Sequence, residues 1–211
     1  KSQRGIDMTL SEFDNEIRKD HNVVCGCDEA GRGPLAGDVF AAAVIFDKDT
    51  VIEGINDSKK LTAKKREELF DEIMEKAVDF SIQTATVEEI EDINILNAAM
   101  LAMKRAVEDM DTKPDVCLID GNKTPEGLEC PAIAVVKGDA KSQAVAAASI
   151  LAKVARDRYM EQMAEQYPEY RFEKHKGYGT KLHYQMIDQY GPCGIHRMSF
   201  LKKYYAKKNG H

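Results

Sequence analysis

Short apolar runs separated by amphipathic stretches form the dominant pattern of the chain. Two runs near the start, 23–28 and 39–46, flank a glycine-bearing turn and predict an antiparallel hairpin. Alternation of apolar and polar residues over 79–87 predicts a third strand. Two later runs predict further strands: 116–119, which is continuously apolar, and 133–136.

Helical patterns fill the spaces between these runs. Thr62 is placed to cap one amphipathic helix, and a capping box at 86–89 opens a second that runs to about residue 110. A third helix, from 141 to about 163, carries a face of small residues suited to close packing. Hairpin strands followed by strand–helix alternation predict an α/β fold. We expect a mixed β-sheet flanked by helices on both faces, with a helical C-terminal region.

The expected organisation is one domain with two short ends. The 211 residues, 43% of them hydrophobic, suffice for one substantial core, which we place in residues 23–201. Residues 1–22 read as a helix-prone lead-in with little core potential. Because the chain begins at Lys1 rather than Met, we expect this segment to be the remnant of a longer one. Residues 202–211 read as a basic tail.

Composition bears on location. No apolar run is long enough to cross a bilayer, and the acidic first twenty residues do not resemble a signal peptide. The five cysteines are odd in number and lie mostly in strand-like runs, which favours free thiols in a reducing compartment. The sequence therefore predicts a cytoplasmic protein with no membrane association. A monomer is the default expectation.

The charge is unevenly distributed. Residues 1–140 hold 17 Lys and Arg against 30 Asp and Glu, whereas residues 141–211 hold 13 against 6. An acidic front and a basic back suit an enzyme that cleaves a polyanion. A solvated basic tail explains the same numbers equally well.

Acidic residues stand at the ends of three predicted strands: Asp28 with Glu29, Asp120 and Asp139. Buried neighbouring carboxylates are costly unless a cation offsets their charge. Since a regular strand sends adjacent side chains to opposite faces, Asp28 and Glu29 can share one site only if the strand ends or bulges there. An all-oxygen ligand set favours Mg²⁺ or Mn²⁺ over zinc, and two such ions can act on a phosphodiester. Taken singly, Asp120 and Asp139 beside glycines are also compatible with ordinary turns.

Six blocks of sequence carry a family resemblance. They are, in chain order, CDEAGRGPLAG (27–37), NDSKKL (56–61), LIDG (118–121), VKGD (136–139), AASILAKVARD (147–157) and HKGYGT (175–180). Together they resemble type 2 ribonuclease H (ribonuclease HII) of the bacterial kind, from about residue 23 to about residue 201.

This resemblance implies a ribonuclease H-like fold and a metal-dependent endonuclease. The implied activity is cleavage of the RNA strand of RNA–DNA hybrids, and cleavage 5′ of single ribonucleotides embedded in duplex DNA, as in ribonucleotide excision repair. The implied products carry 3′-hydroxyl and 5′-phosphate ends. The four-carboxylate site of the family maps onto Asp28, Glu29, Asp120 and Asp139, with two Mg²⁺ or Mn²⁺ ions as cofactors. RNA–DNA hybrids and ribonucleotide-containing DNA are the implied partners.

Substrate-binding residues follow from the same resemblance. Gly31-Arg32-Gly33 occupies the position of the motif that senses the 2′-hydroxyl, and glycines do allow a backbone to approach a sugar closely. Tyr178 matches the tyrosine that stacks on the deoxynucleotide sugar beside the ribonucleotide. Helical spacing puts Ser149 and Lys153 on one polar stripe with Ser142 and Arg156, expected to face the duplex. Lys59 and Lys176 are expected to contact phosphates, although solvated lysines fit equally well.

Several alternatives remain open. Asp157 is a second choice for the fourth carboxylate, ranked below Asp139 because arginines at 156 and 158 favour an ion pair. Another carboxylate-dependent nuclease of this fold, such as type 3 ribonuclease H, would share the acids. A non-catalytic hybrid-binding protein would share the basic surface. Cys193 and His196 have no second pair at zinc-ligand spacing, which favours a structural role for both.

Overall fold

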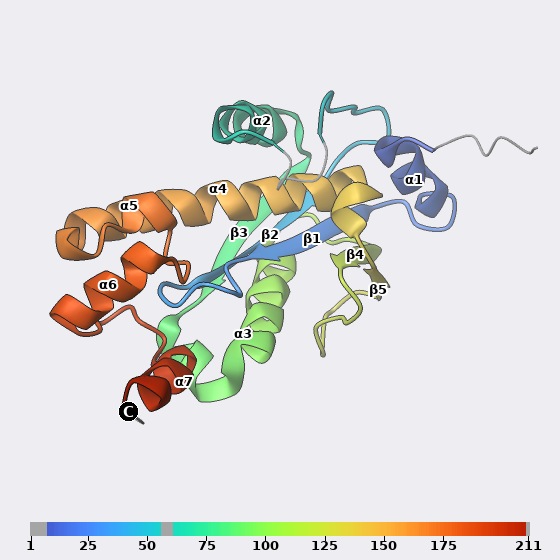
Figure 1. Ribbon diagram of the computed structural model, residues 1–211. Helices are drawn as coiled ribbons and strands as arrows, with labels where there is room; N and C mark the ends of the chain where they lie inside the picture. The colour runs from blue at the N-terminus through green and yellow to red at the C-terminus, as the bar shows by residue number, and fades with distance from the viewer. Residues whose placement is uncertain (1–7, 56–60, 210–211) are drawn as a thin grey trace, which may run out of the picture.

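A five-stranded mixed sheet forms the centre of the molecule (Figure 1). The computed structural model describes residues 8–55 and 61–209. The strand order is β3-β2-β1-β4-β5. β1 and β2 pair antiparallel, as do β2 and β3, whereas β4 runs parallel to both β1 and β5. The bounds are β1 Val24–Ala30, β2 Val39–Ile45, β3 Asp79–Ala85, β4 Val116–Asp120 and β5 Ala132–Val135. The predicted hairpin and mixed sheet are confirmed.

Helices cover both faces of this sheet, as predicted. In Figure 1, α4 lies along one face with α2 beyond it, and α3 covers the opposite face. The bounds are α1 Leu10–Ile17, α2 Ala63–Lys76, α3 Val87–Asp109, α4 Gln143–Gln166, α5 Phe172–His175, α6 Lys181–Tyr190 and α7 Met198–Asn209. Two short 3₁₀ helices, η2 Gly138–Ala140 and η3 Pro168–Tyr170, precede and follow α4. No helix in the described ranges is both long and apolar enough to span a bilayer.

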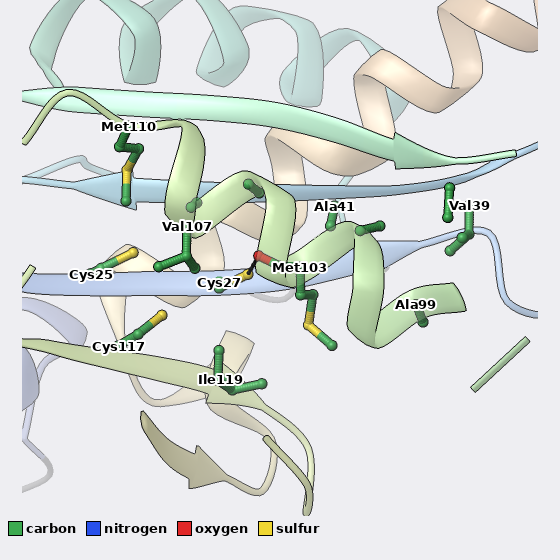
Figure 2. Packing of buried hydrophobic residues seen from close by; sticks show 14 of the residues in the cluster. Cys25, Cys27, Val39, Ala41, Ala99, Met103, Val107, Met110, Cys117 and Ile119 are labelled. Atoms are coloured by element: carbon green, nitrogen blue, oxygen red, sulfur yellow. Dashed lines mark hydrogen bonds between the residues drawn. The ribbon is translucent and has the colours of Figure 1, made fainter. Parts of the chain in front are cut away.

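The core under α3 contains three buried thiols. Figure 2 shows Cys25 and Cys27 of β1 beside Cys117 of β4, packed against Met103 and Val107 of α3. All five cysteines, each within the described ranges, are free. The prediction of unpaired thiols is therefore confirmed.

The opposite core is built on close approach between α4 and β1. A Cβ added to Gly26 would lie 2.2 Å from the carbonyl carbon of Ala144, a separation that real atoms do not tolerate. Ala147 and Ala148 are fully buried in the same layer. The small residues of α4 and the glycine within β1 thus let the helix lie directly on the strand. This contact sets the distance between α4 and β1.

Residues before β1 contribute more to the fold than the sequence suggested. Phe13 and Ile17 of α1 pack against a core cluster that includes Val24 of β1. Asp14 is 1% exposed, and its Oδ2 accepts a hydrogen bond of 2.9 Å from the backbone N–H of Ala144. The expectation of little core potential is wrong for α1, because its apolar side and this buried carboxylate bind it to the N-terminal end of α4.

Candidate active site

Asp28 and Asp120 occupy the same face and the same end of two neighbouring strands. The parallel register of β1 and β4 pairs Cys27 with Ile119, so each acid is the next residue along its strand. Gly26 abuts the backbone of α4, and Leu118 packs with Val145 of α4. Because side chains alternate along a strand, both acids project on the α4 side. The parallel register therefore brings the two carboxylates together.

Glu29 reaches the site without the expected break in the strand. β1 continues regularly to Ala30 and pairs Asp28 with Ala42 and Glu29 with Ala41. The prediction that the strand ends or bulges at the acids is wrong. β4 ends at Asp120, one step beyond the last residue that it pairs with β1, so the final residues of β1 have no β4 neighbour. Glu29 thus borders the same opening from the edge of the sheet.

A cavity of about 240 Å³ joins these acids to several of the predicted substrate contacts. It is lined by Asp28, Glu29, Ala30, Gly31, Arg32, Asp120, Ser149, Lys153 and Tyr178. Three of the four predicted carboxylates, most of the Gly31–Gly33 motif and the predicted tyrosine thus share one opening.

The acids create a concentration of negative charge. Asp28 is 5% exposed, and burial raises the pKa of its carboxyl well above the ordinary value. The negative charges of Glu29 and Asp120 raise this pKa further. Hydrogen bonds from the Glu29 N–H, at 2.7 Å, and from Ser149 oppose the shift without outweighing it. A cation at this position would relieve the repulsion.

The donor set fits a hard divalent cation held partly by other ligands. Within the described residues, no three His, Cys, Asp or Glu side chains converge as a complete metal site. Mg²⁺ commonly uses one or two carboxylates and completes its shell with water and substrate phosphates. Buried Asp28 and its partly exposed neighbour Asp120 meet that requirement, and their oxygen donors suit Mg²⁺ or Mn²⁺ better than zinc.

Asp139 lies next to this group but does not line the cavity. It sits in η2 and is 8% exposed. The N–H of the preceding residue, Gly138, donates to Oδ1 of Asp120 at 2.6 Å. The turn that holds Asp139 is therefore attached directly to one of the two paired acids.

Asp157 forms an ion pair, with a partner other than the two arginines expected. Its Oδ1 accepts from Nζ of Lys153 at 2.6 Å. Of those arginines, Arg158 pairs with Glu67, while Arg156 is buried and donates to backbone carbonyls. Lys153 thus stands between Asp157 and the cavity.

The Gly31–Gly33 segment requires its first glycine. Gly31 has φ +99°, and a Cβ there would lie 2.2 Å from Nε of Arg156. Arg32 is half-exposed, and its Nη1 donates to Oε1 of Glu29 at 3.3 Å. A Cβ on Gly33 would lie 3.8 Å from Cε1 of Tyr178, an ordinary van der Waals contact. The segment therefore faces Tyr178 across a narrow gap.

Tyr178 is exposed and sits among cations. Its side chain is 43% exposed, and the Lys153 ammonium and the Arg156 guanidinium carbon each lie 5.9 Å from its ring centroid. An exposed ring beside an acidic cavity suits stacking on a sugar or base.

Two hydrogen-bonded buried histidines, His183 and His196, hold the backbone carbonyl of Tyr178. Nδ1 of His196 accepts from the Cys193 N–H at 2.8 Å, so His196 must carry its proton on Nε2. That proton is donated to Nε2 of His183 at 3.0 Å, and His183 then donates from Nδ1 to the Tyr178 carbonyl at 2.9 Å. Burial is the main cause that lowers the pKa of both His183 and His196 to about 4. Both rings are therefore neutral at pH 7.

Among the described residues, the predicted contacts Lys176, Ser142 and Arg156 do not line the cavity. The Lys176 ammonium donates to Oε1 of Glu161 and to the Glu173 carbonyl, away from the cavity. Lys59 lies outside the described residues. The predicted polar stripe is wrong at two positions: Ser142 is buried as the N-cap of α4, and Arg156 is 1% exposed. Only Ser149 and Lys153 of that stripe line the cavity.

Arg197 is a residue that sequence reasoning missed. It is 0% exposed, and its guanidinium donates to the carbonyls of Gly31, Arg32, Pro34 and Gly37. An arginine in a basic C-terminal segment has no local feature that distinguishes it from solvated neighbours. Only the tertiary contact with the Gly31–Gly33 segment reveals it.

The chain matches one family over most of its length. A family model described as ribonuclease HII matches residues 25–203. Ribonuclease HII of Caldicellulosiruptor saccharolyticus is 54% identical over 199 residues, covering 94% of this chain and 97% of that protein. Ribonuclease HII of Idiomarina loihiensis is 58% identical over 178 residues, covering 84% of this chain and 95% of that protein.

A solved structure agrees with these matches. The ribonuclease H2 of Pyrococcus horikoshii OT3 superposes with a TM-score of 0.70 at 30% identity, covering 84% of this chain and 93% of that one. The predicted ribonuclease H-like fold is confirmed. Because the family model and the curated relatives span the strands, the acids and the Tyr178 loop alike, the chain belongs to the ribonuclease HII family.

Proposed function

We propose that this protein is a divalent-metal-dependent endoribonuclease that cleaves the RNA strand of RNA–DNA hybrids and cuts 5′ of single ribonucleotides in duplex DNA. The products would carry 3′-hydroxyl and 5′-phosphate ends. Family membership makes the chain a nuclease. The observation that carries the finer proposal is the single cavity shared by Asp28, Asp120, the Gly31 backbone and Tyr178. It pairs an acidic centre with groups able to examine a sugar.

Asp28 and Asp120 are the residues that would hold Mg²⁺ or Mn²⁺, with Glu29 and Asp139 completing the set. When bound, two such ions supply an activated water and stabilise the leaving oxygen. Asp28 is well suited to this role, because its buried carboxylate interacts strongly with charge in a low-dielectric setting. Glu29 also accepts from Arg32, which joins the acidic centre to the Gly31–Gly33 motif.

The Gly31–Gly33 backbone on one side of the cavity and Tyr178 on the other would together select ribose. The backbone of Gly31, Arg32 and Gly33 would meet the 2′-hydroxyl, which is both donor and acceptor and distinguishes RNA from DNA. Tyr178 would stack on the neighbouring deoxyribose, where a 2′-hydroxyl is absent. A Cβ added to Gly33 would already be in van der Waals contact with the Tyr178 ring, at 3.8 Å, so a side chain larger than a methyl group has little room there.

Cations around the cavity would bind phosphates. Lys153 and Arg32 line it and are charged donors suited to phosphate oxygens, and Ser149 adds a hydroxyl. Lys59 and Lys176 are proposed as further phosphate contacts, and the Lys176 ammonium must leave Glu161 to serve as one. We expect a monomer in the cytoplasm that acts in ribonucleotide excision repair. The five free cysteines suit that reducing compartment.

The test is cleavage of an end-labelled DNA duplex that contains one ribonucleotide, in Mg²⁺, in Mn²⁺ and in EDTA. The expected result is one cut 5′ of the ribonucleotide with either metal and none in EDTA. Equal cutting of an all-DNA duplex would favour a general carboxylate-dependent nuclease. Digestion of long hybrids without a cut at the single ribonucleotide would favour type 3 selectivity. Binding without any cleavage would favour a hybrid-binding protein.

A further inference from the structure

Two buried guanidinium groups lie directly beneath the Gly31–Gly33 segment. Arg156 of α4 is 1% exposed, and Arg197, just before α7, is 0% exposed. Together they donate seven hydrogen bonds, every one to a backbone carbonyl. Among the described residues, no carboxylate lies within ion-pair distance of either group.

The two arginines divide one loop between them. Arg197 donates to the carbonyls of Gly31 at 2.7 Å, Arg32 at 3.1 Å, Pro34 at 2.9 Å and Gly37 at 2.9 Å. Arg156 donates to Ala36 at 3.0 Å and Asp38 at 3.2 Å. Six carbonyls of residues 31–38 are thus turned toward buried charge.

Arg156 and backbone hydrogen bonds connect residues 31–38 to the Tyr178 loop, residues 176–180. The third bond of Arg156 goes to the carbonyl of Lys176 at 3.1 Å. The Leu35 N–H donates to the Gly177 carbonyl at 2.8 Å, and the Gly37 N–H donates to the Ile195 carbonyl at 2.8 Å. The Arg197 N–H donates back to the Leu35 carbonyl at 2.8 Å. The Gly31–Gly33 segment and the loop that carries Tyr178 are therefore both held by the side chains of Arg156 and Arg197.

This arrangement is expensive for a purely structural connection. Buried charges carry a large desolvation cost, and these two like charges also repel each other. The attraction of Asp38, which lies beyond ion-pair distance, offsets this cost only in part. Burial, with a contribution from the Arg156 charge, lowers the pKa of Arg197 to about 9. The benefit is a well-defined loop conformation, because one planar guanidinium fixes the directions of several carbonyl acceptors at once. Because a trans peptide unit points its N–H opposite to its carbonyl, the N–H groups of Arg32 and Gly33 point away from Arg197.

We propose that Arg156 and Arg197 are positioning residues for substrate selection. They fix the Gly31–Gly33 backbone at a set separation from Tyr178, and this separation sets the preference for a ribonucleotide followed by a deoxyribonucleotide. The inference rests on the proposed function, because it assigns the selectivity of that same site to two residues that do not line it.

The test compares Arg156→Lys and Arg197→Lys with the wild type. Each substitution keeps the buried charge but cannot reach the same set of carbonyls. Arg158→Lys is the matched control, since Arg158 also lies on α4 but is exposed and paired with Glu67. The quantity measured is the ratio of kcat/KM for a single-ribonucleotide duplex to kcat/KM for a uniform RNA–DNA hybrid. We expect this ratio to fall at least tenfold in both variants and to stay unchanged in Arg158→Lys.

A role in folding alone would give a different result. Loss of folded enzyme lowers both rates by the same factor and leaves the ratio unchanged. Retention of the wild-type ratio in both lysine variants would overturn the inference. A wild type that cuts neither substrate would instead overturn the proposed function. Binding in EDTA gives a readout without cleavage: the wild type should bind the ribonucleotide duplex more tightly than an all-DNA duplex, and the variants should lose most of that difference.

Hydrogen exchange on the wild type tests the arrangement without any substitution, should a lysine variant fail to fold. The amides of Leu35 and Gly37 should exchange as slowly as those of β1, and a bound ribonucleotide duplex in EDTA should slow them less than twofold further. Rapid exchange in residues 31–37 that slows only on binding would show that the substrate, not the arginine pair, sets the loop, and the inference would fail.

Discussion

The carboxylates of Asp28 and Asp120 lie side by side because β1 and β4 are parallel neighbours in register, although β2, α2, β3 and α3 separate them in the chain. Neither acid needs a special loop to reach the other. Glu29, by contrast, borders the cavity from the edge of the sheet, and Asp139 lies outside the cavity in a turn attached to Asp120. Strand register thus fixes the positions of Asp28 and Asp120 only.

Removing either member of this pair should abolish cleavage without abolishing binding. We expect Asp28→Asn and Asp120→Asn each to lower kcat by roughly a thousandfold or more, because the metal ligands act as a unit. The affinity for a ribonucleotide duplex in EDTA should change by less than about threefold, since Lys153, Arg32 and Tyr178 are untouched. Asp71→Asn, on exposed α2, is the control. Near-normal turnover in Asp28→Asn would contradict the assignment.

Asp28→Asn should also stabilise the metal-free protein. Because folding raises the pKa of Asp28 above its ordinary value of 3.8, the wild type loses stability as the pH rises above that value. Asp28→Asn removes this loss, so in EDTA its Tm should exceed that of the wild type by roughly 3–8 °C, or about 1–2 kcal/mol. The gain should be larger at pH 8 than at pH 4. Thermal unfolding at both pH values measures it, and a lower Tm at pH 8 would count against the described charge cluster.

The fourth carboxylate can be decided by paired variants. Asp139→Asn should reduce kcat by about a hundredfold, since its turn is bonded to Asp120. Asp157→Asn should reduce it by less than about fivefold, since Asp157 is engaged by Lys153. Steady-state rates in saturating Mg²⁺ compare the two. The reverse order of effects would transfer the role to Asp157.

The histidine chain behind Tyr178 predicts acid sensitivity. Folding lowers the pKa of His183 and His196 from 6.5 to about 4, so the stability they contribute is present above pH 6.5 and is lost as the pH falls toward 4. At about 1.4 kcal/mol per pKa unit, the loss is on the order of a few kcal/mol. Urea unfolding from pH 7 to pH 4.5 should show this decrease in the wild type and a smaller one in His183→Gln. His21→Gln, just after α1, is the control, and parallel curves for all three proteins would refute the prediction.

The sequence was informative wherever the feature depended on the local spacing of apolar residues or on the residues at the end of a strand. The acids, the helices on both faces and the free thiols follow from such patterns. Reasoning failed where a distant segment changed the surroundings of a residue. Helical spacing correctly groups Arg156 with Ser149 and Lys153, but residues 31–38 cover that end of α4 and bury the arginine. Arg197 and the histidine chain have no local pattern at all, because their partners lie in other parts of the chain.

The dependence of residues 31–38 on Arg197 also orders events on the ribosome. β1, β4 and both paired acids have been synthesised by residue 120, and α4, which rests on Gly26, by residue 166. The loop proposed to examine the sugar belongs to the first fifth of the chain, yet its four carbonyl contacts with the Arg197 guanidinium form only when residue 197 has emerged. A nascent chain therefore holds Asp28 and Asp120 before residues 31–38 are fixed. On the proposed role of this loop, selectivity would be the last property that such a chain acquires.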